Sequence, residues 1–325
     1  MNDTISPGLL LPTGKAQWGD GTDPRELVGL AVAAEAAGYD SLWVNDSLLS
    51  PRIEALTMLA AVAPATSRVT LGTAALMPVL RRPVQAAQAL ASIDLLSGGR
   101  LTVAVGAGFP GPLGRPLYEL SEVPWAGRFA RLDETVALWR QLWTSDGPSS
   151  FHGRALQFDA IAPVTAPCQP GGPGIWLGGA SPSALARTGR LYDGWLPYPP
   201  DPADYATGLA QVRAAAEDAG RTAAAITPAL FASVLITDDA DGGRAALEGF
   251  SRANYRMPLS RLETIQAVIA GPPEQVTAGL GRYIEAGASH LVLRIAAPDL
   301  RAQREQLERI SGIFPLLRGV TRTAR

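Results

Sequence analysis

Short apolar segments alternate with segments of helical spacing along nearly the whole chain. Most of the apolar segments are followed by a stretch with an apolar residue every three or four positions, such as Pro24–Ala37, which ends at Gly38. Eight segments have the length and composition of buried strands: Gly8–Leu11, Asp40–Val44, Val69–Ala75, Leu101–Gly106, Ile175–Gly178, Gly194–Leu196, Ala229–Thr237 and Ser289–Ile295.

Eight strands that alternate with helices predict an α/β fold, a (β/α)8 TIM barrel, in a single domain over residues 1–325. The alternative is an open, doubly wound parallel sheet, but no glycine fingerprint follows the first strand. Two connections are longer than one helix needs. Ala107–Leu142 and the hairpin pattern of Phe151–Phe158 follow strand 4, and the polar, partly irregular Asp238–Pro258 follows strand 7. The sequence therefore predicts insertions after strands 4 and 7.

Composition narrows the classes of partner. The 325 residues are 47% hydrophobic and 18% charged, which allows a large core, and the net charge of −2 argues against nucleic acid or an anionic membrane as partner. No uncharged apolar run reaches the length of a membrane span, and the N-terminus lacks the pattern of a signal peptide. Cys168 is the single cysteine, so an internal disulfide is excluded. These features favour a cytoplasmic protein.

In a barrel of this kind the chemistry lies at the carboxyl ends of the strands. The predicted ends are small, apolar and rich in glycine, and they contain neither histidine nor cysteine. With only His152 and His290 in the chain, a metal site is not expected. A mouth with few acids and bases suits a cofactor that brings its own reactivity.

Two of these ends have features that a cofactor would use. Ile175–Leu185 reads as a strand, a Gly-Gly turn and a helix that begins at Ser181-Pro182, which makes either a phosphate site or an ordinary capped turn. The third strand ends in Ala74 and Ala75, before a loop bounded by proline. Such a strand end is either an unremarkable turn or a flat surface for a ligand.

Taken together and in order, several stretches resemble the bacterial luciferase-like flavin-dependent oxidoreductase and monooxygenase family. The stretches are AEAAGYDSLWVNDS (34–47), LGTAALMPVLRRPVQ (71–85), DLLSGGRLTVAVGAG (94–108), Arg128 with Leu132–Glu134, QPGGPGIWLGGASPSAL (169–185) and YDGWLP (192–197). The resemblance implies a (β/α)8 barrel with a flavin or deazaflavin across its mouth, in a homodimer. It also implies that the segment before the last strand, around Asp238–Pro258, is a lid.

The resemblance assigns the cofactor-binding residues. It implies that the ring packs against Ala74 and Ala75, whose peptide bond is expected to be cis although neither residue is proline. It implies that the phosphate is held by the turn after the fifth strand and by an arginine of the following insertion. The residues concerned are Gly178, Gly179, Ala180, Ser181 and Arg128.

Four further positions at the mouth, and three on the loops above it, are candidate site residues. Trp43 either walls the ring or is a core aromatic, and Asp46 either contacts the ring or substrate or caps a loop. Ser47 stands where the family often has histidine, so a proton-transfer role there is in doubt. Gly106 stands where luciferases have cysteine, which argues against light emission. Trp125, Tyr198 and Phe109 lie on loops above the mouth, where they would line a substrate pocket.

The resemblance leaves three functions open. The first is a monooxygenase that acts on a small organic substrate with molecular oxygen through a C4a-peroxyflavin. Its reduced FMN would come from a separate flavin reductase, since no dinucleotide fingerprint is present. The alternative is hydride transfer with the deazaflavin coenzyme F420, which the loss of the histidine after Asp46 disfavours. The third is a non-catalytic flavin-binding partner subunit.

Overall fold

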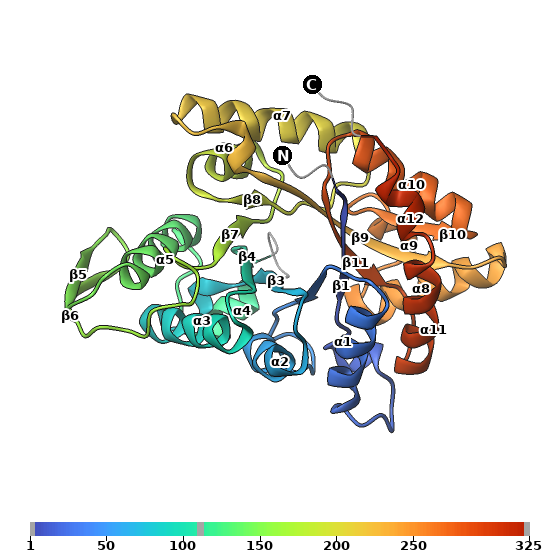
Figure 1. Cartoon of the computed structure of the whole chain (residues 1–325), viewed down its shortest axis with the longest axis horizontal. Helices are drawn as coiled ribbons and strands as arrows, with labels where there is room; N and C mark the ends of the chain where they lie inside the picture. Colours follow the sequence, from blue (N-terminus) through green and yellow to red (C-terminus); the bar gives the residue numbers. More distant parts are fainter. Residues whose placement is uncertain (1–3, 109–113, 322–325) are drawn as a thin grey trace.

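The computed structural model describes residues 4–108 and 114–321. Its centre is a closed barrel of parallel strands surrounded by helices (Figure 1). The barrel strands are β1 (Ser6–Leu10), β2 (Ser41–Val44), β3 (Thr70–Leu76), β4 (Leu101–Val105), β7 (Gly174–Leu177), β8 (Gly194–Trp195), β9 (Thr227–Ile236) and β11 (His290–Ile295). They match the eight segments expected from the sequence to within two residues at most ends, so the predicted (β/α)8 barrel is confirmed.

Closure of the barrel depends on β9. Its first residues, Thr227 and Pro228, pair with β8, and its opposite edge pairs with β11, which pairs with β1. The second half of β9 pairs with β10 (Val268–Gly271), a strand that the sequence did not reveal. Because β10 has four residues and ends in glycine, its sequence has little strand character. It forms where β9 extends beyond the short β8.

The helices follow the strands around the barrel. They are α1 (Glu26–Ala36), α2 (Ala55–Val62), α3 (Pro83–Ser97), α4 (Arg115–Leu120), α5 (Arg128–Trp143), α6 (Pro182–Leu191), α7 (Pro202–Asp218), α8 (Ala240–Tyr255), α9 (Leu259–Leu262), α10 (Pro273–Glu285), α11 (Leu300–Ser311) and α12 (Phe314–Arg318). Short 3-10 turns cover Lys15–Gln17 (η1), Ala63–Ala65 (η2), Pro78–Leu80 (η3) and Ala223–Ala225 (η5). The expected hairpin is present as β5 (Ser149–His152) and β6 (Gln157–Ile161), which pair antiparallel after α5.

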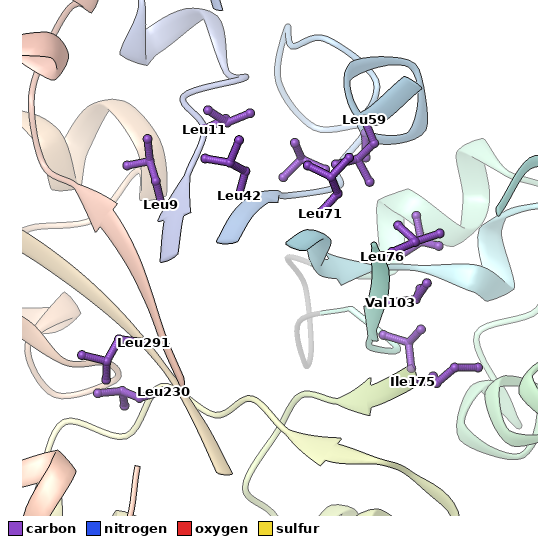
Figure 2. Packing of buried hydrophobic residues seen from close by; sticks show 14 of the residues in the cluster. Leu9, Leu11, Leu42, Leu59, Leu71, Leu76, Val103, Ile175, Leu230 and Leu291 are labelled. Atoms are coloured by element: carbon purple, nitrogen blue, oxygen red, sulfur yellow. The ribbon is translucent and has the colours of Figure 1, made fainter. Parts of the chain in front are cut away.

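The main hydrophobic core lies between the ring of strands and the helices. Leu9, Leu42 and Leu71 are fully buried on neighbouring strands, and Leu59 of α2 packs among them (Figure 2). Burial of such side chains stabilises each by about 1.5–3 kcal/mol relative to exposure. This outer core fixes the helices against the barrel and leaves the inside of the barrel to a separate set of residues.

The segment Asp238–Pro258, expected to be irregular in parts, is irregular only at its two ends. It forms α8, whose start is capped by the Asp239 carboxylate, which accepts a hydrogen bond from the Gly242 N–H at 3.0 Å. Leu247 and Phe250 are buried on one face of this helix. The two adjacent glycines and the polar residues concealed a helical stripe of apolar residues.

Two indole rings fill the part of the barrel interior that lies farther from the carboxyl ends of the strands. Trp43 and Trp176 lie with ring centroids 5.1 Å apart, and the His290 ring meets both edge-on. The Trp43 Nε1–H donates to Ser41 Oγ, and Ser41 Oγ lies 2.8 Å from His290 Nε2. We call these four residues the barrel floor. Gly72 lets the Trp43 ring approach the β3 backbone, since a Cβ there would overlap the ring.

His290, at the start of β11, is a buried structural histidine. Burial lowers the pKa of His290 to about 4. Because Ser41 Oγ already accepts from Trp43, its hydroxyl is free to donate to an unprotonated His290 Nε2. The neutral ring therefore completes the hydrogen bonds of the barrel floor.

Substitution of Gly72 tests the packing of the floor. Gly72→Ala forces a methyl group against the Trp43 ring, and overpacking of this kind costs about 1–3 kcal/mol or more. Gly174→Ala on β7 is the matched control, because no atom lies within 4 Å of its added Cβ. We expect chemical denaturation to show a large loss of unfolding free energy for the first variant and little change for the second. Equal losses would contradict this packing.

His290 also predicts a pH dependence of stability. Its pKa is lower in the folded protein than in the unfolded chain, so its stabilising contribution is present above pH ~6.5 and is lost as the pH falls towards ~4. Between pH 7 and pH 5 we expect wild type to lose about 2 kcal/mol more unfolding free energy than His290→Gln. Denaturation of both proteins across this range measures the difference. Parallel pH profiles would show that His290 titrates normally.

Candidate active site at the barrel mouth

Small residues from two neighbouring strands form a flat surface at the carboxyl end of the barrel. Ala74 and Ala75 of β3 are half-buried, and the peptide bond between them is cis, as predicted. Gly106 follows β4, where a Cβ would lie 3.8 Å from the Ala75 Cβ. We call Ala74, Ala75 and Gly106 the ring seat. The two alanines pack on the cluster that contains Trp43 and Trp176, so the floor supports the seat from below.

Trp43 lies beneath this seat. Its side chain is fully buried, and its contacts are those of a core aromatic residue of the barrel floor. The structure therefore places it under the ring seat, where it supports the surface. A direct contact between Trp43 and a cofactor stays a prediction.

The turn after β7 is where the sequence predicts a phosphate site. Gly179 has a φ of +102°, a conformation that favours glycine, and its carbonyl accepts from the Trp195 Nε1–H at 2.9 Å. Ser181 caps α6 by accepting a hydrogen bond from the Ala184 N–H at 3.3 Å, and Pro182 is the first helical residue. Together with Gly178 and Ala180 these residues form what we call the phosphate turn. Ala180 and Ser181 are exposed, so the start of the ten-residue helix is open to a ligand.

Arg128 begins α5, and its guanidinium stacks on aromatic rings. Its Cζ lies 3.8 Å from the centroid of Trp125 and 4.3 Å from that of Phe129. Arg187, in the middle of α6, lies with its Cζ 5.3 Å from the centroid of the Phe129 ring, so the start of α5 lies beside α6. The Arg128 Nε is buried and has no hydrogen-bond partner within residues 4–108 and 114–321. An incoming phosphate would satisfy this donor.

Asp46 joins two loops of the mouth. Its carboxylate accepts from the Met77 N–H at 3.0 Å and from both Arg81 Nη atoms, at 2.5 and 3.1 Å. Arg81 also binds Glu54. Burial disfavours the charged guanidinium, but the hydrogen bonds and charges of Asp46 and Glu54 outweigh it and raise the pKa of Arg81. With both oxygens engaged, Asp46 holds the end of β2 against the residue that follows β3.

We call the pairing of Asp46 with Arg81 and the Met77 N–H the clamp. Ser47 lies next to the clamp and takes no part in it. Its hydroxyl accepts a hydrogen bond from the Leu49 N–H at 3.1 Å, and its side chain is half-buried. A catalytic role for Asp46 or Ser47 stays a prediction. The clamp itself involves Arg81, which the sequence reasoning did not single out because its partner lies 35 residues away.

A cavity of about 390 Å³ opens beside the phosphate turn. Gly179, Ala180 and Tyr198 line it together with side chains of α7. This agrees with the expectation that Tyr198 faces a pocket, whereas Trp125 stacks on Arg128 and Phe109 lies outside the described residues. In the part of the chain that the structure describes, no group of three His, Cys, Asp or Glu side chains would hold a metal ion. In that same part, no helix is long and apolar enough to cross a membrane.

Two arginines of the mouth were missed by the sequence reasoning. Arg294 occupies an inward-facing position of β11, two residues after Val292 and four after His290, and is 6% exposed. Arg52 lies in the loop after β2 and is half-buried. An arginine inside the apolar run LVLRIAA is unusual, and this pattern could have identified Arg294 as a candidate site residue. The residues around Arg52 contain no comparable pattern.

A closed parallel barrel with a ring seat on β3 and β4 and a turn of this kind after β7 is the arrangement that the sequence led us to expect of a luciferase-like oxidoreductase. Residues 7–290 match the family described as luciferase-like monooxygenase, and the chain belongs to this family.

Relatives within the family use F420. The chain is 30% identical to the F420-dependent glucose-6-phosphate dehydrogenase of Kribbella flavida, over 91% of this chain and 95% of the relative. It is 28% identical to the enzyme of the same name from Amycolatopsis mediterranei, over 91% and 96%. The fold is shared with an F420-dependent secondary alcohol dehydrogenase solved with an F420-acetone adduct, with a TM-score of 0.80, 22% identity and coverage of 97% and 99%.

These findings contradict the expectation of an FMN-dependent monooxygenase and support the alternative, F420. The physical reason for the error is that FMN and F420 both present a tricyclic ring and a phosphate. The ring seat and the phosphate turn fit either group and cannot distinguish them. Serine at position 47, where the family often has histidine, disfavoured hydride transfer in the sequence analysis. The similarity to F420-dependent dehydrogenases is the stronger observation.

The phosphate assignment of Arg128 predicts a selective loss of affinity. Arg128→Met should weaken binding of F420 by about 10- to 100-fold, because a charge-assisted hydrogen bond contributes about 1.5–3 kcal/mol. It should leave the affinity for the corresponding deazariboflavin, which lacks the phosphate, nearly unchanged. Fluorescence titration measures both, with Arg115→Met, an exposed arginine of α4, as the control. An equal loss for both ligands would place Arg128 at the ring instead.

Proposed function

We propose that the protein is an F420-dependent oxidoreductase that exchanges a hydride with a small organic substrate. The observation that carries the proposal is the similarity, over nine-tenths of the chain, to dehydrogenases that depend on F420. The ring seat and the phosphate turn support it, because they offer a flat apolar surface and an anion site at one mouth.

The chain's own residues would bind and orient the cofactor. F420, when bound, would accept the hydride of an alcohol substrate, a transfer of two electrons that needs neither oxygen nor a separate flavin reductase. Ala74, Ala75 and Gly106 would support one face of the ring, and the buried indoles beneath them exclude water from that face. The clamp between Asp46 and Arg81 would keep the loop after β3 in place.

Ser47 sets this chain apart from the family pattern. A serine hydroxyl has no pKa suited to acid–base catalysis near neutral pH, so it would not take the proton of a substrate hydroxyl. The proposal therefore gives Ser47 a hydrogen bond to the substrate and leaves the proton to solvent. Glucose-6-phosphate, named for the relatives, is one candidate among phosphorylated and other small alcohols.

Side-by-side titration with F420 and FMN under anaerobic conditions tests the proposal. We expect F420 to bind at least about tenfold tighter than FMN, and addition of air to cause no enzyme-dependent oxygen consumption. Ala75→Leu should weaken F420 binding by blocking the ring seat, whereas Ala130→Leu on the exposed face of α5 should not. Tighter binding of FMN with oxygen consumption would refute the proposal.

A further inference from the structure

Arg294, which is buried, and Arg52, which is half-buried, form a pair of neighbouring cations at the mouth. In the ring of eight strands, β11 lies four places from β4, and therefore opposite it. Arg294 points inwards near the carboxyl end of β11, on the same side of the strand as Val292. The pair is thus separated from the phosphate turn, which follows β7 on the other side.

Arg294 is held by neutral groups alone. Its Nη1 donates to the Tyr255 hydroxyl at 2.7 Å, and its Nη2 donates to Asn254 Oδ1 at 2.8 Å and to Gln17 Oε1 at 3.1 Å. The ring of Phe250 lies 4.9 Å from the guanidinium carbon. No carboxylate of the described residues forms a salt bridge with Arg294, and its buried Nε lacks a partner among them. The end of α8 therefore orients a guanidinium whose charge is not balanced.

Arg52 lies close to Arg294 and likewise has buried nitrogen atoms without a partner among the described residues. Its Nη2 donates to Ser50 Oγ at 2.8 Å, while its buried Nε and Nη1 have no partner within the described residues. Arg52 Nη2 and Gln17 Oε1 both lie within 4 Å of the point where a Cβ on Gly14 would stand, so Arg52 is next to the side chain that holds Arg294. Burial first, and then the charge of Arg294, lower the pKa of Arg52, and Asp46 only partly offsets this.

Two neighbouring guanidiniums whose buried N–H groups have no partner among the described residues are unfavourable without an anion. The nearby carboxylate of Asp46 is already bound by Arg81 through both of its oxygens. The arrangement instead matches the planar donors that recognise carboxylate and phosphate groups. A ligand between the ring seat and this pair of arginines would satisfy the free N–H groups.

We propose that Arg52 and Arg294 bind an oxyanion, a carboxylate or a phosphate, of the substrate that exchanges its hydride with the cofactor. This inference rests on the proposed function and gives the substrate its chemical class: an alcohol or carbonyl compound with an anionic group. The cofactor phosphate belongs to the phosphate turn, and the substrate anion belongs to the arginine pair.

Binding of simple anions to the F420-loaded protein is the first test, because the cofactor then occupies the phosphate turn. Calorimetric titration with inorganic phosphate and with acetate, at constant ionic strength, should show one site for at least one of them. Arg52→Met and Arg294→Met should each weaken it about tenfold or more. Arg82→Met, an exposed arginine at the start of α3, makes the same change in net charge and should leave it unchanged. Absence of anion binding in wild type would overturn the inference.

Thermal stability separates a binding role from a structural one. Without an anion, Arg52→Met should unfold at the same or a higher temperature than wild type, because it removes a buried charge that lacks a partner. With phosphate or acetate, wild type should gain stability and the variant should not. A large loss of stability without anion, with the anion-induced gain retained, would show that Arg52 is structural.

A substrate panel then distinguishes the source of the oxyanion. Hydroxycarboxylates, sugar phosphates and neutral alcohols of similar size are compared by the rate of F420 reduction. The arginine variants should raise KM about tenfold or more for the preferred anionic class, with little effect on neutral alcohols. Equal effects on neutral alcohols, or a matching loss of F420 affinity, would overturn the inference.

If wild type fails to bind F420 at all, the proposed function fails. Anion titration of the cofactor-free Arg128→Met variant, in which the phosphate turn lacks its arginine, then still tests the arginine pair.

Discussion

The arrangement of the mouth depends on the pairing of β9, the strand that closes the barrel. Only two register pairs join it to β8, and Trp195 strengthens this short closure. The Trp195 ring stacks on Tyr205 with centroids 5.1 Å apart, and its N–H binds the Gly179 carbonyl. The residue that closes the barrel thus also fixes the turn proposed to hold the cofactor phosphate. With the ring of strands closed, the loops that follow the carboxyl ends of the strands meet at one end.

Inside the ring, large and small residues are divided between two levels. The indoles of Trp43 and Trp176 fill the lower level, and glycines such as Gly72 and Gly194 give them room against the strands. Because this level is already full, the level above needs no large side chain for stability. That is why Ala74 and Ala75 form a surface at the mouth without leaving the barrel hollow.

The sequence was sufficient for features that depend on local pattern. The eight strands, the cap at Ser181 and the cis bond between Ala74 and Ala75 all follow from short stretches or from their ordered resemblance to a family. Features that depend on distant contacts were missed. β10 is stabilised by its pairing with β9. The pairing of Asp46 with Arg81 and the approach of Arg52 to Arg294 of β11 join segments that meet only in the closed barrel. The sequence also could not distinguish the two cofactors, because the ring seat and the phosphate turn suit both FMN and F420.

The clamp on Asp46 has a consequence for how such enzymes diverge. Residue 46 is committed to the architecture of the mouth, whereas the neighbouring Ser47 hydroxyl bonds only within its own loop. A single exchange at position 47 can therefore alter the proton chemistry offered to a substrate without loosening the loops that support the ring seat. In this scaffold, the residue that holds the loops, Asp46, stands next to one that can change without loosening them, Ser47.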